Sequence, residues 1–212
     1  MSILDVGGGD GSLLDLIKEQ NPQVKRTSVV DIDTKAEDRA KRKGHQFYLS
    51  KIEEAALQEK FDLILMLNIL EHVSDPQGVL LKAVQQLAPG GVLIVKTPNT
   101  ATFERHLFRR LNWGGLHCPR HWILFEASTL KQLLRCCGLD EISIFYTQGA
   151  PQWTTTLLGI LADLRLLSVT KKRPMYQHPL YNLTLALTAI FDCVRLPFSK
   201  TAQMFVVAKK GP

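Results

Sequence analysis

A cluster of glycines near the start of the chain limits the fold more than any other feature. Gly7, Gly9 and Gly11 follow a short apolar run, residues 3–6, and precede leucines and an isoleucine at helical spacing. This order predicts a strand, a tight loop and a helix. At the end of a strand in an open α/β sheet, such a loop brings backbone N–H groups close to a ligand.

The alternation of apolar runs and amphipathic stretches continues through residue 99. The run 61–67 is continuously apolar, which is typical of a central parallel strand buried on both faces. Strands that alternate with helices predict a doubly wound, Rossmann-like α/β sheet. Besides the first unit, strands are expected at 27–32, 46–49, 61–67 and 92–96, and helices at 34–43 and 77–88.

After residue 100 the pattern changes. Two apolar helices are expected at 153–167 and 180–196, joined by a basic segment, residues 171–174. A shorter helix at 128–137 and strands at 142–147 and 203–208 complete the pattern. Because single cores stop growing at roughly 250 to 300 residues, the 212 residues predict one domain, residues 1–212.

The positive charge is confined to the second half of the chain. The formal net charge is +6, but residues 1–100 carry 12 Lys and Arg against 14 Asp and Glu, so residues 101–212 carry a net +8. The chain has no recognisable RNA-binding module, and aromatic residues alternate with basic ones only around Trp113 and Trp122. These features argue against a nucleic-acid partner.

An acidic residue supports a specific ligand for the glycine loop. Asp31 closes the second predicted strand 20 residues after Gly11, where a carboxylate accepts hydrogen bonds from ribose hydroxyls. The loop and the acid together indicate an adenosine-containing ligand. The glycines fall at every second position, not as Gly-x-Gly-x-x-Gly, which disfavours a nicotinamide-dependent oxidoreductase.

These residues belong to a series of motifs that resembles a known family, the class I S-adenosylmethionine-dependent methyltransferases. The Leu-Glu-His-Val element is similar to that of the quinone-biosynthesis O-methyltransferases. The resemblance covers about residues 2–148 and the final strand. It is carried by residues 3–11, 30–32, 61–64, 70–73, 87–91, 119–122 and 125–130.

The resemblance implies a seven-stranded, mostly parallel sheet with its last strand antiparallel, and S-adenosylmethionine as the cofactor. Residues 1–100 would then be the cofactor-binding half, and residues 101–212 the acceptor-side half with a helical insertion at about 151–198. The acceptor would be a small or lipid-linked molecule, methylated at oxygen. The implied cofactor-binding residues are Asp5, Gly7, Gly9, Gly11, Asp31, Ile32, Ser50, Lys51, Leu67 and Asn68.

Three histidines are candidate catalytic residues. If the acceptor is a hydroxyl, a base must remove its proton, and an imidazole with a pKa of about 6.5 suits that task. His72 follows the fourth predicted strand, and His117 and His121 lie beyond the fifth. For each, a purely structural role is the alternative. Related quinone methyltransferases can bind a metal through two acids and a histidine, but Asn68 replaces the first acid, so no metal is expected.

Cysteine usage and the basic residues bear on where the protein is located and what it contacts. Four cysteines without a Cys-x-x-Cys pair, and a start without a basic leader, favour a cytoplasmic protein with reduced thiols. The apolar helices with neighbouring cations fit peripheral membrane contact, a cover for the sheet or a twofold interface. Arg105, Arg109, Arg110 and Arg120 could face an anionic acceptor or solvent.

A second class of function remains open. The chain begins inside the first predicted strand, whereas the resembled enzymes usually have helices before it that fold over the cofactor. Together with Asn68, this feature motivates the alternative of a methyltransferase-like module that binds the cofactor without turnover.

Overall fold

The computed structural model describes residues 1–170 and 173–211 of the chain. Lys171 and Lys172 of the predicted basic segment therefore lie outside the described residues. Two compact units are present. The first, here called the sheet unit, comprises Met1–Thr97, Ser128–Ile144 and Phe205–Pro212, and the second, the helical unit, comprises Pro98–Ala127 and Phe145–Met204. That residues 1–212 form one domain stays a prediction, because compactness does not establish that either unit folds alone.

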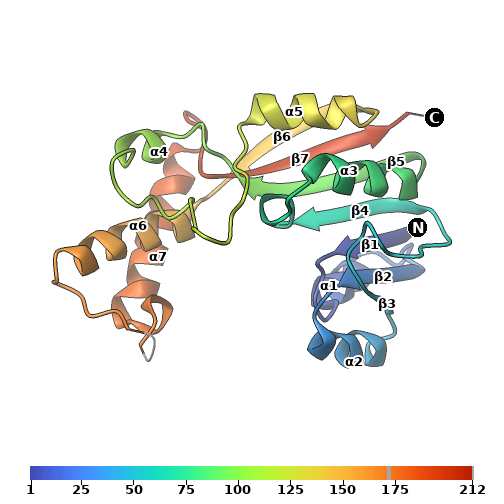
Figure 1. Cartoon of the computed structure of the whole chain (residues 1–212), viewed down its shortest axis with the longest axis horizontal. Helices are drawn as coiled ribbons and strands as arrows, with labels where there is room; N and C mark the ends of the chain where they lie inside the picture. The colour runs from blue at the N-terminus through green and yellow to red at the C-terminus, as the bar shows by residue number, and fades with distance from the viewer. Residues whose placement is uncertain (171–172, 212) are drawn as a thin grey trace. The chain divides into compact units, whose positions relative to one another are not determined.

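The described residues form a seven-stranded sheet in the order β3-β2-β1-β4-β5-β7-β6. β1 lies between β2 and β4 and is parallel to both, β3 is parallel to β2, and β5 is parallel to β4. β7 runs antiparallel to its two neighbours (Figure 1), so the predicted fold class is confirmed. The strands are β1 Ser2–Val6, β2 Arg26–Asp31, β3 Gln46–Leu49, β4 Phe61–Leu67, β5 Leu87–Pro98, β6 Leu139–Thr147 and β7 Gln203–Lys210.

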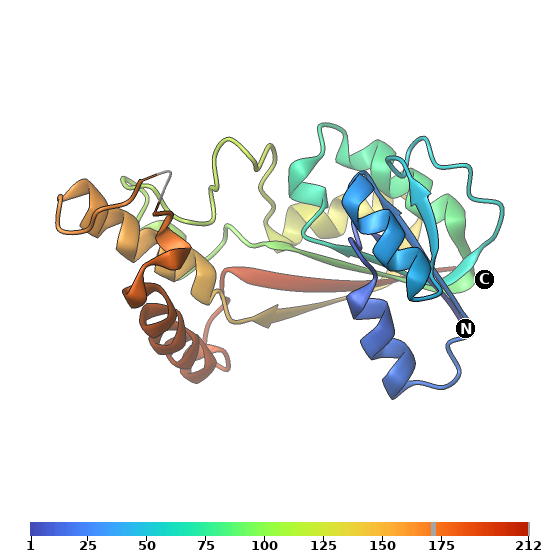
Figure 2. The same cartoon turned by 90° about the horizontal axis from the view of Figure 1, so that it is seen from below.

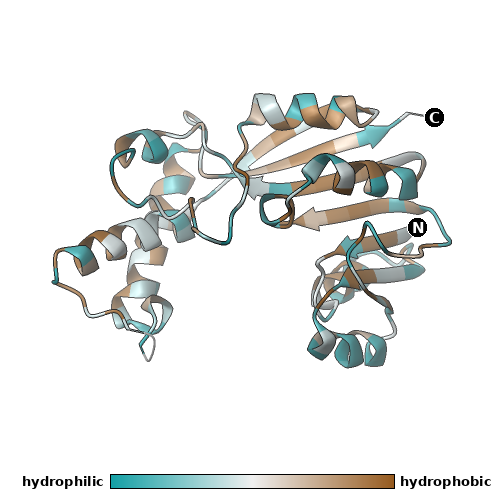
Figure 3. Ribbon diagram, in the orientation of Figure 1, coloured by the Kyte–Doolittle hydropathy of each residue, from teal (hydrophilic) through white to brown (hydrophobic). Residues whose placement is uncertain are grey.

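Four α-helices belong to the sheet unit: α1 Ser12–Gln20, α2 Thr34–Arg42, α3 Pro76–Gln86 and α5 Ala127–Cys136, of which α5 begins at the last residue of the helical unit. Every residue of β1 is buried, and Leu14 of α1 and Ala40 of α2 pack with it in one apolar cluster. Figure 3 shows the strands as mainly hydrophobic and α2 as mainly hydrophilic. Each helix therefore covers the sheet with one apolar face, as its spacing predicts.

The predicted end of the third helix is wrong. The helix expected at 77–88 ends at Gln86, and Pro89 to Gly91 belong to β5 instead of closing the helix. The reason is tertiary: Leu87 pairs with Phe61 of β4, and the ammonium of Lys210 donates hydrogen bonds to the carbonyl oxygens of Val84 and Leu87 at 2.9 and 3.0 Å. The lysine satisfies carbonyl groups that a helix end leaves open.

The helical unit contains α4 Phe103–Leu107, α6 Ala150–Asp163 and α7 Pro179–Arg195. α6 packs against α7, as Figures 1 and 2 both show. The helix predicted to reach residue 167 ends at Asp163, because Arg165 adopts a left-handed conformation with φ 60°. A helical pair between β6 and β7 is thus present, and its status as an insertion into the family fold stays a prediction.

The core of the helical unit is aromatic. Phe108, Trp113 and Trp153 pack together around Ala202, and the Phe108 and Trp153 rings meet edge to face at 5.5 Å between centroids. None of the helices that the structure describes is both long enough and apolar enough to span a bilayer.

Candidate functional site

The predicted cofactor-binding residues gather at one edge of the sheet unit. β1, β2, β3 and β4 are parallel, so their carboxyl ends meet at the same edge, where open α/β sheets bind ligands. The backbone N–H of Ser50, just after β3, donates to the carbonyl oxygen of Asp31 at 3.1 Å. Ser50 is half-buried and Lys51 is exposed beside it. β2 and β3 therefore end together.

The glycine loop has the backbone shape that only glycine adopts without strain. The φ angles are 74° at Gly7, 55° at Gly9 and 74° at Gly11. At Gly7 a Cβ atom would lie 2.1 Å from the Cδ1 of Ile69, so the loop packs tightly on the segment after β4. At Gly9 a Cβ atom would meet nothing within 4 Å. Gly9 thus faces open space, as expected of a backbone that a ligand approaches.

Asp31 ties the loop to the second strand. Its Oδ2 accepts a hydrogen bond from the Gly9 N–H at 2.8 Å, and its Oδ1 accepts one from the Asp33 N–H at 2.9 Å. Each carboxylate oxygen can accept a further bond, so ribose hydroxyls could bind without displacing the loop. Ile32, the next residue, is 70% exposed. An exposed apolar side chain therefore lies next in the chain to a carboxylate that can accept further hydrogen bonds.

Asp5 is the buried acid beneath the loop. Its side chain is 3% exposed, and a Cβ atom at Gly8 would lie 2.6 Å from its carboxyl carbon. Burial raises the pKa of Asp5 from its ordinary 3.8 to about 7, and the charge of Asp31 adds to the increase. Asp5 therefore supports the loop from below and does not face open space.

The raised pKa predicts a pH dependence of stability. The folded chain holds the Asp5 proton more tightly than the unfolded chain, so this contribution is complete below pH 3.8 and is lost as the pH rises through about 7. Between pH 5 and 8 we expect the wild type to lose about 2 to 3 kcal/mol more unfolding free energy than Asp5→Asn. Urea denaturation at both pH values measures this. Asp38→Asn, which changes an exposed carboxylate, should behave like the wild type, and parallel losses in wild type and Asp5→Asn would contradict the assignment.

A buried carboxylate organises the end of β4. Glu71, in the short helix η1 Leu70–His72, is fully buried. Its Oε1 accepts a hydrogen bond from Nδ2 of Asn68, and its Oε2 accepts one from the hydroxyl of Thr97, both at 3.0 Å. Asn68 has a left-handed φ of 58°, and its N–H donates to the carbonyl oxygen of Lys96. Glu71 thus joins the ends of β4 and β5 and fixes Asn68, while Leu67 just before it is half-buried.

Thr97 was not among the predicted site residues, and Glu71 was noted only as part of the Leu-Glu-His-Val element. The one available signal was the Thr97-Pro98-Asn99 segment at the end of a predicted strand. Both oxygens of Glu71 already accept hydrogen bonds within the sheet unit. The expected lack of a metal stays a prediction.

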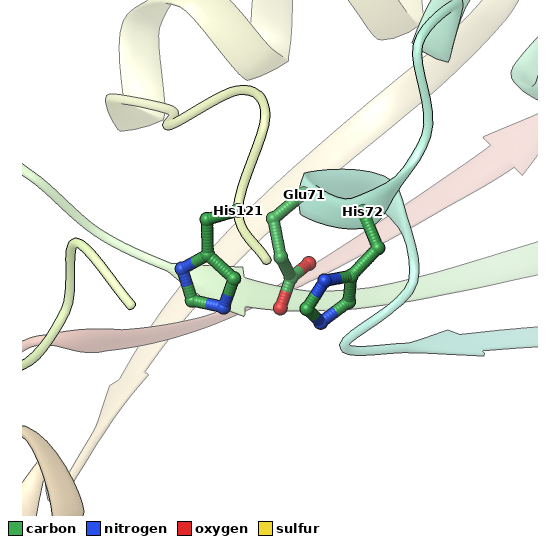
Figure 4. Close-up of side chains that lie close together, drawn as sticks. All are labelled: Glu71, His72 and His121. Atoms are coloured by element: carbon green, nitrogen blue, oxygen red, sulfur yellow. The ribbon is translucent and has the colours of Figure 1, made fainter. Parts of the chain in front are cut away.

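His72 is exposed, next to buried Glu71, and its N–H donates to the carbonyl oxygen of Ile69 at 2.9 Å. Figure 4 draws the Glu71 and His72 side chains on η1. The third residue labelled there, His121, belongs to the helical unit. His72 therefore stands at the same sheet edge as the glycine loop.

The two other candidate histidines lie together in the helical unit. The His117 and His121 rings meet edge to face, with 5.0 Å between centroids. Nδ1 of His121 forms a 2.9 Å hydrogen bond with the carbonyl oxygen of Gly115, which requires the proton on that nitrogen. Nδ1 of His121 is therefore the donor nitrogen in this bond.

Comparison with known proteins gives the family. A family model described as a methyltransferase domain matches residues 1–144. A probable S-adenosylmethionine-dependent methyltransferase of Mycolicibacterium smegmatis is 25% identical over 90% of this chain and 73% of its own length. A ubiquinone biosynthesis O-methyltransferase of Idiomarina loihiensis is 33% identical over 67% of this chain, which spans 63% of that enzyme.

A solved structure shows the same fold. The crystal structure of a SAM-dependent methyltransferase from Archaeoglobus fulgidus aligns with a TM-score of 0.61 at 18% identity, covering 99% of this chain and 86% of the other. The family match includes the glycine loop, Asp31 and the Glu71 segment, all of which lie at the carboxyl edge of the sheet. The chain belongs to the S-adenosylmethionine-dependent methyltransferase family, and S-adenosylmethionine is its cofactor.

Proposed function

We propose that this protein transfers a methyl group from S-adenosylmethionine to an oxygen atom of a small or lipid-linked acceptor. The observation that carries the proposal is the hydrogen bond from the Gly9 N–H to Asp31 at the open face of the glycine loop. It places an acceptor for ribose hydroxyls and an unobstructed backbone next to each other. The oxygen acceptor is supported by the Idiomarina relative, which is named as an O-methyltransferase.

When bound, S-adenosylmethionine would supply a sulfonium methyl group: the acceptor atom bonds to the methyl carbon while the carbon–sulfur bond breaks in line, and the demethylated thioether product leaves. The protein has to orient the two reactants and exclude water. Asp31 holds the ribose, Ile32 packs on the adenine, and Ser50 and Lys51 border the base. Gly7, Gly9 and Gly11 line the methionine part of the cofactor, and Asp5 supports this loop. Leu67 and Asn68 border the reacting centre, with Asn68 fixed by Glu71.

Removal of the acceptor proton requires a base, and His72 is our first candidate. It is exposed at the carboxyl edge of β4 and follows the fixed Glu71. His121 is the second candidate, through its Nε2, and His117 is in ring contact with it. The two candidates are separable, because His72→Ala and His121→Ala each test one proton acceptor by the pH profile of turnover.

The competing function is a cofactor-binding module without turnover. Incubation of the full chain with methyl-labelled S-adenosylmethionine and a cell extract tests it, with labelled small molecules and lipids profiled afterwards. We expect transfer of label to at least one acceptor. Cofactor binding without transfer to any acceptor would favour the module.

Two glycines provide a matched test of the cofactor site. Gly9 and Gly44 both have positive φ angles, 55° and 82°, and in both a Cβ atom would meet nothing within 4 Å. Each alanine variant should therefore lose a similar stability, about 1 kcal/mol. Only Gly9→Ala should weaken cofactor binding, by about tenfold or more, because its methyl group occupies the space that the cofactor needs. Calorimetry measures both affinities, and equal affinities would contradict the assignment.

We also propose that the protein touches membranes peripherally through α7. Leu183, Leu187, Ile190 and Val194 follow one another at helical spacing and are 55%, 59%, 62% and 68% exposed. The net +8 of residues 101–212 favours an anionic lipid surface. At low salt we expect the protein to float with vesicles that contain phosphatidylglycerol.

The test has a charge-matched control. Leu187→Glu should abolish flotation, whereas Asn182→Glu, which adds the same charge to an exposed position outside this row, should reduce it only slightly. Failure of the wild type to float would end the membrane proposal without affecting the proposed reaction.

A further inference from the structure

The helical unit contains a pocket that neither the family match nor the cofactor site explains. Its volume is about 710 Å³, within the range of pockets that hold small molecules. All of its lining residues lie in the segment 100–126, which belongs to the helical unit. The family match does not say what such a pocket holds, so its chemistry has to be read from the side chains.

The lining is rich in cationic groups. Arg105 and His106 lie on α4, and Arg109 lies in the turn that follows this helix; all three residues line the pocket. Among the described residues, neither arginine forms an ion pair with a carboxylate. Glu126 is the single acid of the lining, and Leu124 is apolar. The pocket thus offers two planar donors to a ligand.

The wall that carries the arginines is fixed from behind. Glu104, their neighbour on α4, is fully buried and its Oε2 accepts a 2.6 Å hydrogen bond from Arg195. The hydroxyl of Thr102 accepts a hydrogen bond from the Arg105 N–H at 3.2 Å and so caps α4. Thr100, which also lines the pocket, donates from its N–H and from its hydroxyl to the carbonyl oxygen of Phe125. The arginines therefore extend from a fixed backbone.

Guanidinium groups on a fixed wall select planar or tetrahedral oxyanions. Arginine presents paired N–H donors that match the oxygen atoms of a carboxylate or phosphate, and such charge-assisted bonds are about twice as strong as neutral ones. Glu126 disfavours a second negative charge in the same pocket and suits a hydroxyl or ammonium group on the remainder of the ligand.

We propose that Arg105 and Arg109 bind the carboxylate or phosphate group of a small-molecule acceptor in this pocket. The inference rests on the methyltransferase function proposed above only where it calls the ligand a methyl acceptor. The anion-binding site itself does not depend on that function. The ligand class is a soluble molecule with one anionic group and a hydroxyl-bearing body. The basic net charge of residues 101–212 then has a local purpose, because part of it recognises the ligand.

Binding of simple probes to the full chain tests the proposal. Benzoate and phenyl phosphate should bind in calorimetry or ligand-observed NMR, and the neutral isostere benzamide should bind at least about tenfold more weakly. Arg105→Gln and Arg109→Gln should each weaken phenyl phosphate binding about tenfold or more. Arg110→Gln, which changes the exposed neighbour outside the lining, should not, and thermal melting checks that all three variants fold.

Glu126→Gln gives an opposite and more diagnostic outcome. Removal of the one acid should strengthen phenyl phosphate binding about threefold or more, with a smaller effect at high salt. A merely structural role of Glu126 would not produce a gain. Equal binding of benzoate and benzamide, or unchanged binding in both arginine variants, would overturn the proposal. Because the wild type is expected to bind anionic vesicles through α7, the lipid test uses the Leu187→Glu variant. If this variant binds vesicles that contain phosphatidic acid, loses that binding with Arg105→Gln, and does not bind phenyl phosphate, the ligand is a lipid headgroup and not a soluble small molecule.

The result separates this inference from the proposed function. If methyl transfer occurs but the anionic probes do not bind, the pocket proposal fails and the function stands. If the probes bind as described but no acceptor is labelled, the function fails and the anion site stands. Cofactor affinity should be the same in wild type, Arg105→Gln and Arg109→Gln, since the predicted cofactor residues all belong to the sheet unit.

Discussion

Replacement of Asp31 by asparagine is expected to weaken S-adenosylmethionine binding at least about 100-fold. The Asp31 carboxylate accepts the Gly9 N–H at 2.8 Å and is the acceptor that we assign to the ribose hydroxyls. Hydrogen bonds to a charged group contribute about 1.5 to 3 kcal/mol each, and at least two are weakened together. An amide also presents two donors, one of which would face the Gly9 N–H or the ribose. Calorimetry with S-adenosylmethionine and with its demethylated product measures the loss.

The matched control is Asp38→Asn. It makes the same change of charge and volume at an exposed position of α2, seven residues further along the chain. Its cofactor affinity should equal that of the wild type, which excludes a general effect of net charge. If Asp31→Asn binds the cofactor with wild-type affinity, the assignment of the ribose to Asp31 is refuted, even though the fold stays as described.

Much of the sheet edge could be predicted because its signals are local. The strand, glycine loop and helix around Gly9, and the distance from Gly11 to Asp31, follow from periodicity and spacing within about 30 residues. The backbone requirement at positive φ also leaves a direct trace, because glycine is the residue that meets it without strain. The family resemblance drawn from these motifs is confirmed by the match over residues 1–144.

The missed features depend on contacts between distant segments. Lys210 shortens the third helix by bonding to Val84 and Leu87, more than 120 residues away in the chain. Thr97 is part of the site only because β5 lies beside β4, which brings its hydroxyl to Glu71. A single sequence contains no marker for such pairs. The support that Glu71 gives to Asn68 is visible only in its two hydrogen bonds.

A buried ionic cluster in the helical unit was also missed, because it joins residues that lie far apart in the sequence. Arg195 donates to Glu104, which lies 91 residues earlier, at 2.6 Å, and to Asp192 at 2.7 Å. Both acids are fully buried, and Asp192 also accepts hydrogen bonds from the N–H of Gly149 and from the indole of Trp153. In the sequence, Asp192 is an acid within the mainly apolar stretch predicted as a helix at 180–196. In the structure it connects α6 and α7, and through Arg195 it connects them to α4.

Arg195→Met is therefore expected to lower the free energy of unfolding by about 3 to 5 kcal/mol, because it leaves two buried carboxylates without their cation. Burial raises the pKa of Glu104 even though Arg195 acts in the opposite direction. Loss of Arg195 therefore removes an interaction that stabilises the charged form of this buried acid. The guanidinium also lies 5.6 Å from the Trp153 ring centroid, and this contact is lost as well. Urea denaturation followed by tryptophan fluorescence measures the change, because all three tryptophans belong to the helical unit.

Two further variants separate charge from packing. Arg110→Met removes an exposed arginine from the same unit and should change stability by less than about 0.5 kcal/mol. Glu104→Gln combined with Arg195→Met should be more stable than Arg195→Met alone, because one of the two unpaired charges is gone. If the double variant is as unstable as the sum of its single changes, the cluster contributes through packing alone. The α4 wall that carries Arg105 and Arg109 would then be held by the aromatic core around Phe108 and Trp153, not by the ion pair.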